Sequence, residues 1–135
     1  MNGKVFLDTN ILVYAHTDFD TVKQLVAQQI ITDNNSFVST QVLQELTNTL
    51  NRKFKVTWNS VEAVLRDVTV NNSLHVNTSG TIFSALNVAN RYNYSFYDCM
   101  IISAALESNC SVLYSEDLQD GHIINKILTI KNPFK

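Results

Sequence analysis

The sequence predicts a single α/β domain with a mainly parallel five-stranded sheet and helices on both faces. Short apolar runs with the length of buried strands alternate with longer segments whose apolar residues recur at helical spacing. A chain of 135 residues with 45% hydrophobic residues, three Gly and one Pro has the size and composition of one compact domain. We therefore expect residues 1–135 to form one domain without a linker or internal repeat.

The first strand and the helices after it account for residues 4–31. Residues 4–8 are an apolar run that stops at Asp8, as a buried strand does at the edge of a sheet. Residues 10–16 continue as an apolar turn or short helix. Residues 19–31 predict a scaffold helix from apolar side chains at helical spacing, which are Val22, Leu25, Val26 and Ile30.

A second strand at residues 37–39 leads into a helix that Ser39 or Thr40 can cap and that runs to about residue 53. Glu45 lies beside the apolar stripe of this helix. An ordinary boundary glutamate with its carboxylate in water would explain Glu45 as well. The stripe comprises Val42, Leu43, Leu46 and Leu50.

A basic cluster, Arg52, Lys53 and Lys55, stands at the end of this helix. Cations at that position can meet the helix dipole and the free carbonyls. The same cluster, assisted by Phe54 and Trp58, can also bind an RNA backbone. Both interpretations stay open.

Two helices enclose a third strand in the next stretch. Apolar spacing predicts a helix over residues 60–70 and a strand at residues 74–76. Thr78 or Ser79 then caps a helix that ends near Arg91.

The pattern Ser95-x-x-Asp98 precedes an apolar segment, residues 99–106, which predicts a buried helix. A capping box would explain Asp98 without any further role. Because the helix is apolar almost all round, its start should nevertheless point Asp98 into the interior or a cleft. A strand at residues 112–115 follows, and the last strand, at residues 127–130, is expected at an edge of the sheet.

Four acidic residues lie at comparable points of these elements. Asp8 and Asp117 follow strands, Glu45 lies early in a helix, and Asp98 lies at a helix start. Ligands bind at the carboxyl ends of the strands in such sheets. Four carboxylates in one low-dielectric cleft would repel one another by several kcal/mol unless a cation is bound or protons are taken up. Turn chemistry alone would also explain Asp8 and Asn10, but the convergence favours a metal site.

Composition limits the classes of function. The net charge of −2 argues against a globally basic surface for nucleic acid, so a phosphate substrate would be held by a metal or a local cluster. Cys99 and Cys110 lack metal-ligand spacing and fit reduced core thiols, and His16, His75 and His122 also lack ligand spacing. No stretch has the pattern of a signal peptide or membrane span, so we expect a soluble, cytoplasmic protein.

The ordered motifs Val-Phe-Leu-Asp8-Thr-Asn10, Glu45, Phe-Tyr-Asp98 and Leu-Tyr-Ser115-Glu-Asp117 resemble those of the PIN-domain nucleases. The resemblance spans essentially the whole chain and is greatest to the small VapC-like toxins of bacterial toxin–antitoxin pairs. It implies a Mg²⁺- or Mn²⁺-dependent ribonuclease, commonly an endonuclease, that is often a homodimer and is inhibited by a cognate antitoxin. Hard divalent cations prefer carboxylate and water ligands, which agrees with an acid cluster without His or Cys.

The resemblance also implies roles for individual residues. Asp8, Asp98 and Asp117 would bind metal directly or through water, and Glu45 would be a ligand or a base that orients water. An arginine from an antitoxin could enter this acidic site and pair with its carboxylates. Supporting residues would be Asn10 and Ser115, which can hold the carboxylates by hydrogen bonds, and further acids of the last loop are Glu116 and Asp120.

Other classes of function remain open. A haloacid-dehalogenase-type phosphatase also begins with a strand and an Asp, but it requires a second Asp two residues later, where this chain has Asn10. A catalytically silent PIN-like scaffold for RNA or protein would retain the same acids. If every acid served only in capping and turns, the chain would be a plain α/β domain.

Overall fold

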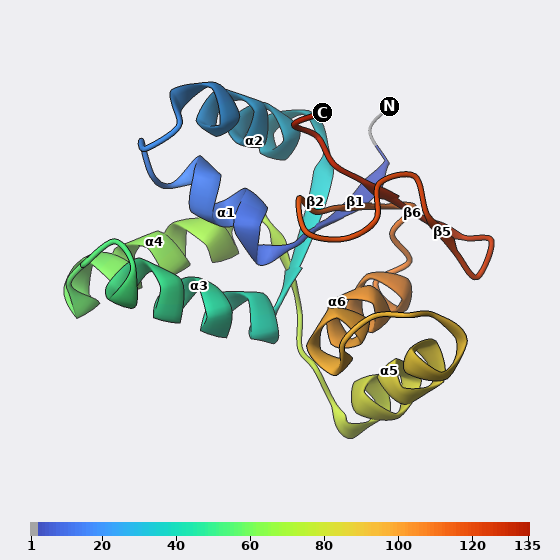
Figure 1. Ribbon diagram of the computed structural model, residues 1–135. Coiled ribbons are helices and arrows are strands. Elements are labelled where there is room, and N and C mark those ends of the chain that lie inside the picture. Colours follow the sequence, from blue (N-terminus) through green and yellow to red (C-terminus); the bar gives the residue numbers. More distant parts are fainter. Residues whose placement is uncertain (1–2) are drawn as a thin grey trace.

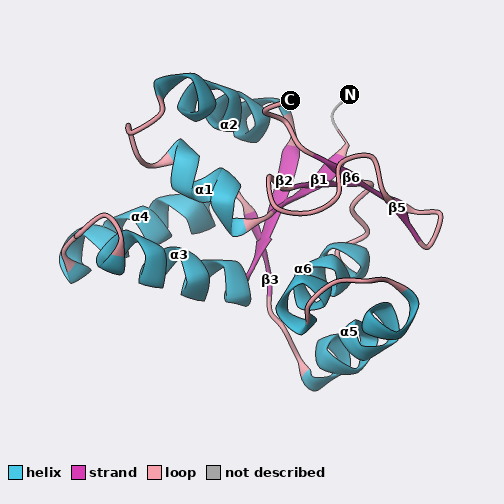
Figure 2. Cartoon of the chain, in the orientation of Figure 1, coloured by secondary structure: helices cyan, strands magenta, loops and turns pink. Residues whose placement is uncertain are grey.

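A computed structural model describes residues 3–135 and confirms the α/β class (Figures 1 and 2). Residues 1 and 2 of the expected domain lie outside the described residues. The elements in chain order are β1 (Lys4–Leu7), α1 (Thr9–Ala15), α2 (Thr21–Asp33), β2 (Asn35–Ser39), α3 (Thr40–Arg52), α4 (Trp58–Asn71), β3 (Ser73–His75), α5 (Ser79–Arg91), α6 (Phe96–Glu107), β4 (Val112–Tyr114), β5 (Ile123–Ile124) and β6 (Leu128–Lys131).

The sheet has the strand order β3-β2-β1-β4-β6-β5, and only the pairing of β5 with β6 is antiparallel. Phe6 of β1 pairs with Phe37 of β2 on one side and Leu113 of β4 on the other. Helices α1 to α4 lie on one side of the sheet and α5 and α6 on the other (Figure 1). The prediction of a mainly parallel sheet between helices is thus confirmed.

The strand count and the edge were predicted wrongly. The sheet has six strands rather than five, and β5 rather than the strand at residues 128–131 forms the edge. Asn125 and Lys126 have positive φ angles of 52° and 59° between β5 and β6, as tight hairpin turns require. A strand of two residues, Ile123 and Ile124, is too short to show the alternation that sequence patterns detect.

Side-chain caps begin the helices where the sequence indicated. Ser39 accepts a hydrogen bond from Val42 N at the start of α3, and Ser95 accepts one from Asp98 N at the start of α6. Thr78 is the N-cap of α5. The three predicted cap positions are confirmed. The Ser39 and Ser95 hydroxyls each satisfy a backbone N–H that has no partner within its helix, and at Thr78 the backbone N donates to Thr81 Oγ1 at 3.1 Å.

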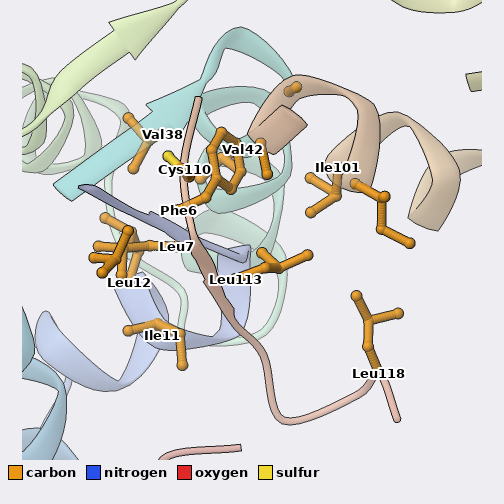
Figure 3. Packing of buried hydrophobic residues seen from close by; sticks show 14 of the residues in the cluster. Phe6, Leu7, Ile11, Leu12, Val38, Val42, Ile101, Cys110, Leu113 and Leu118 are labelled. Atoms are coloured by element: carbon orange, nitrogen blue, oxygen red, sulfur yellow. The ribbon is translucent and has the colours of Figure 1, made fainter. Parts of the chain in front are cut away.

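The core lies between the sheet and the helices. Figure 3 shows Leu7 beside Leu12 in this core, with Phe6 and Leu113 nearby, and all four side chains are fully buried. In α6 every residue from Cys99 to Ala105 is buried, which confirms the prediction of a buried helix. Cys99 and Cys110 are buried free thiols.

Helix α2 is exposed over much of its predicted apolar stripe. Val22 is 72% exposed and Leu25 is 67% exposed, whereas Ala27 and Ile30 are buried. The helix packs on α1. Half of the predicted stripe, Val26 and Ile30, joins the core, and the other half stays in solvent. Within residues 3–135, none of the helices combines the length and apolarity that crossing a membrane needs.

We expect Leu50→Ala, in α3, to lower the free energy of unfolding by about 2–5 kcal/mol, because Leu50 is 1% exposed and its loss leaves a cavity. The matched variant Leu25→Ala should change that free energy by less than about 0.5 kcal/mol. Urea denaturation of both variants measures the difference. Equal destabilisation would show that α2 packs through its predicted stripe after all.

Candidate active site

A cavity of about 420 Å³ opens beside the carboxyl ends of β1 and β4, and its lining includes the four acids selected from the sequence, which come from four parts of the chain. Asp8 follows β1, Glu45 lies in α3, Asp98 lies in the first turn of α6, and Asp117 lies in the loop after β4. The fold therefore brings the acids selected from the sequence to one cavity.

Asp8 is the most enclosed of these acids, with 6% of its surface exposed. Thr9 N donates to its Oδ1 at 2.8 Å, and Ser115 Oγ donates to its Oδ2 at 2.8 Å. Ser115 Oγ also accepts from Asp117 N at 3.1 Å and Leu118 N at 3.3 Å. One hydroxyl thus fixes the carboxylate after β1 relative to the loop after β4.

Asn10 connects the same loop to α1. Its Nδ2 donates to Asp117 Oδ2 at 3.2 Å, and its Oδ1 accepts from Glu116 N at 3.2 Å. The side chain therefore orients a carboxylate and restrains the backbone beside it. Asn10 and Ser115 make the hydrogen bonds that carboxylate-holding residues require.

Glu45 is held by two residues that the sequence analysis missed. Thr9 Oγ1 donates to Glu45 Oε1 at 2.6 Å, and Gln41 Nε2 donates to Glu45 Oε2 at 3.3 Å. Gln41 Nε2 also donates to the carbonyl oxygen of Tyr97 at 3.1 Å, next to Asp98. The spacing of Gln41 and Glu45 by four residues on one helix was a signal for their contact, but the contact of Thr9 with α3 had none.

Burial controls the proton affinity of Asp8. Desolvation raises its pKa from 3.8 to about 6, against the lowering effect of the hydrogen bonds from Ser115 and Thr9 N. The negative charges of Glu45 and Asp117 raise the pKa further. The site therefore stores electrostatic repulsion that a bound cation would relieve.

Glu116 also lines the cavity, but its charge is already paired. Lys23 Nζ forms an ion pair with Glu116 Oε2, and the Tyr14 hydroxyl donates to Glu116 Oε1 at 2.7 Å. Burial acts to raise the pKa of Glu116, but the hydrogen bonds from Lys23 and Tyr14 outweigh it and the net pKa is lowered. This ion pair connects the loop after β4 to α2.

The remaining residues selected from the sequence lie in different places. Asp120 Oδ1 accepts from Asn132 N at 2.8 Å and so holds the C-terminal segment. Lys53 caps α3 and lines the cavity, whereas Arg52 and Lys55 are exposed residues outside the cavity lining.

The donor set suits a hard divalent cation, because all four acids offer carboxylate oxygens. Within residues 3–135, no three His, Cys, Asp or Glu side chains are grouped closely enough to enclose an ion. Mg²⁺ does not require such a cage, since it keeps several waters and binds through one or two carboxylates. The buried carboxylate of Asp8, with half-buried Glu45 and Asp98 and exposed Asp117 around the same cavity, fits such a water-rich ion.

The sequence matches the PIN domain family over residues 5–119, and the chain belongs to this family. VapC20 of Mycobacterium tuberculosis, a toxin that cleaves the sarcin–ricin loop, has a similar structure, with a TM-score of 0.68 and 17% sequence identity over 84% of this chain and 91% of that one. VapBC2 of Rickettsia felis, bound to a DNA fragment from its promoter, gives a TM-score of 0.68 and 18% identity over 96% of this chain and 99% of that one. Comparison with curated proteins gave no significant match. The family predicted from the ordered acids is confirmed, and the likeness to VapC proteins holds for the fold.

We expect Asp8→Asn to stabilise the metal-free protein above about pH 6. Folded Asp8 binds its proton more tightly than unfolded Asp8, so the wild-type free energy of unfolding falls as pH rises from about 4 to about 6. The shift corresponds to about 3 kcal/mol, which the variant should gain relative to wild type across that range.

Urea denaturation in EDTA at a series of pH values measures this difference. Ser115→Ala provides the contrast. It removes a hydrogen bond that lowers the pKa of Asp8, so its free energy of unfolding should fall by more in total than that of wild type as pH rises. If the free energies of unfolding of wild type and Asp8→Asn change with pH in the same way, the pKa of Asp8 is not raised in the folded protein.

Proposed function

We propose that this protein is a divalent-metal-dependent endoribonuclease and the toxin of a type II toxin–antitoxin pair. The observation that carries the proposal is the convergence of Asp8, Glu45, Asp98 and Asp117 on one cavity of a PIN-domain chain. The similar folds of VapC20 and VapBC2 support the toxin role. Such a toxin would act on RNA in the cytoplasm.

In this proposal Asp8, Asp98 and Asp117 hold Mg²⁺ or Mn²⁺, directly or through water. The ion, when bound, supplies a water of lowered pKa and offsets charge on the phosphoryl oxygens. Glu45 either joins the ligands or accepts a hydrogen bond from the attacking water and so orients it. Its own orientation is fixed by Thr9, at 2.6 Å.

The supporting residues keep these carboxylates from moving apart. Ser115 holds Asp8, and Asn10 holds Asp117, so that neither carboxylate is free to rotate out of the cavity. Loss of such outer contacts typically costs about 10- to 100-fold in metal affinity or activity. Glu116 is not assigned to the metal, because Lys23 and Tyr14 already engage its carboxylate.

We expect purified protein to cut a mixed RNA pool in Mg²⁺ or Mn²⁺ and to stop cutting in EDTA. Asp8→Asn should lower the rate by about 100-fold or more, because it removes an inner carboxylate rather than an outer contact. Asp33→Asn is the matched control, since Asp33 is an exposed acid of α2 outside the cavity lining and should leave the rate unchanged.

The outcomes separate the nuclease from a silent scaffold. Cutting that requires metal and Asp8 supports the proposal. Metal binding by calorimetry without any cutting of the pool favours a binding scaffold. Cutting that survives Asp8→Asn removes Asp8 from the mechanism.

We also propose that an antitoxin protein binds at the same cavity. An arginine from that partner could enter the cavity and pair with the carboxylates in place of the metal, which would block the nuclease. Co-purification of a small protein encoded by an adjacent gene, with loss of RNA cutting, would support this inhibition. A freely active nuclease without such a neighbour would oppose it.

We also propose a homodimer that buries an apolar face of α5. Leu86 lies one turn from both Ile82 and Phe83 on this helix. The exposed fractions are 44% for Ile82, 68% for Phe83 and 46% for Leu86. Exposed apolar clusters of this kind commonly mark protein interfaces.

We expect Phe83→Glu to convert the dimer into a monomer, because it places a charge in the apolar contact. Light scattering coupled to gel filtration measures the mass. Phe83→Leu is the matched control and should remain dimeric. A monomeric wild type, or a Phe83→Glu variant that stays dimeric, would exclude this face as the interface.

A further inference from the structure

The cavity continues beyond the four acids to an end with a different chemistry. Phe19, in the loop between α1 and α2, lines this end and is 54% exposed. Lys53, at the end of α3, lines it too. Neither residue has a part in holding the carboxylates, so this end of the cavity needs a separate explanation.

Neighbouring rings hold Phe19 in place. Its ring is stacked on Tyr14, with centroids 5.4 Å apart and an interplanar angle of 24°. Phe54 lies on it at 5.2 Å with an angle of 42°. The flat apolar surface that Phe19 presents is therefore fixed before any ligand arrives, which lowers the entropy cost of binding.

Lys53 supplies a positive charge beside this surface. Its Nζ lies 5.7 Å from the ring centroid of Phe19 and 5.5 Å from that of Phe54. Within the described part of the chain, Lys53 forms no salt bridge with an acid. The rings thus position the ammonium group while leaving it able to pair with an anion.

One face of α3 connects the two ends of the cavity. Four residues of this face line the cavity, and three of them follow Glu45 by three, four and eight positions. They are Asn48, Thr49 and Lys53. The helical rise places Lys53 about 12 Å beyond Glu45 along the axis. The lining therefore changes from carboxylate through amide and hydroxyl to ammonium over this length.

We infer that the Phe19–Lys53 end of the cavity binds one unpaired nucleotide of single-stranded RNA next to the phosphate at the acids. The base stacks on Phe19, Lys53 pairs with a neighbouring phosphate, and Asn48 and Thr49 offer hydrogen bonds to the base edge. Aromatic surfaces beside cations are how proteins hold unpaired bases and their backbone. The inference rests on the proposed function, which supplies RNA as the ligand. Since the cavity is acidic, it also needs a nearby cation such as Lys53 to retain a polyanion.

The test measures binding of a fluorescein-labelled single-stranded RNA dodecamer of mixed sequence by anisotropy in Ca²⁺, with its integrity checked on a gel. We expect Phe19→Ala to weaken binding about 10-fold and Phe19→Trp to preserve it, since stacking depends on a ring. The same dodecamer with abasic residues should bind wild type and Phe19→Ala equally. Phe83→Leu is the aromatic control, because Phe83 is 68% exposed, lies outside the cavity lining and should keep the dimer when it is replaced by Leu.

Lys53→Gln gives a second, independent readout. It should reduce the slope of log affinity against log salt by about 0.7, the value for one phosphate contact on a single strand. Lys126→Gln, at an exposed lysine of the β5–β6 turn, should leave that slope unchanged.

The results distinguish failure of this inference from failure of the proposed function. Loss of binding in Phe19→Ala with rescue by Phe19→Trp supports the nucleotide site even if the protein cuts no RNA. Unchanged binding in Phe19→Ala and an unchanged salt slope in Lys53→Gln overturn it even if cutting is observed, and this end of the cavity then faces a protein. An equal effect of Phe83→Leu also overturns it, because any exposed aromatic ring would then account for the binding.

Discussion

The buried carboxylate of Asp8 is the constraint on which the rest of the site depends. It lies at the carboxyl end of β1, in the middle of the sheet, where burial raises its pKa to about 6. The hydrogen bonds that Ser115 and Thr9 N donate offset part of the cost of a charge in that position. Strand β1, which ends next to Asp8, is buried in the core, so the packing of the core fixes the position of Asp8.

The acids are held by contacts between elements rather than within them. Ser115 joins the ends of β1 and β4, Asn10 joins α1 to the loop after β4, and Thr9 joins α1 to α3. Each contact restrains a carboxylate that its neighbours repel. The same network would keep metal ligands preorganised, because little rearrangement is then needed when a cation binds.

Structural and chemical roles coincide at several of these residues. Asp8 is the N-cap of α1 as well as a wall of the cavity, and Asp98 occupies the first turn of α6, where Ser95 caps its backbone N–H. A carboxylate at a helix start is favoured by the helix dipole. Capping therefore does not compete with a role in the site, and at Asp8 and Asp98 it helps to place the acid.

The sequence by itself determined the α/β class and the buried helix α6, and it singled out four acids that the fold brings to one cavity, because strand ends, caps and apolar runs are local signals. It missed β5, whose two residues carry no pattern, and it did not show that Val22 and Leu25 of α2 are exposed, since that depends on how α2 packs on α1. Likewise, only the tertiary structure decided that Thr9 holds Glu45, that Lys23 neutralises Glu116 and that Phe19 meets Lys53. These contacts join residues far apart in the chain, and their geometry arises only when the helices pack around the sheet.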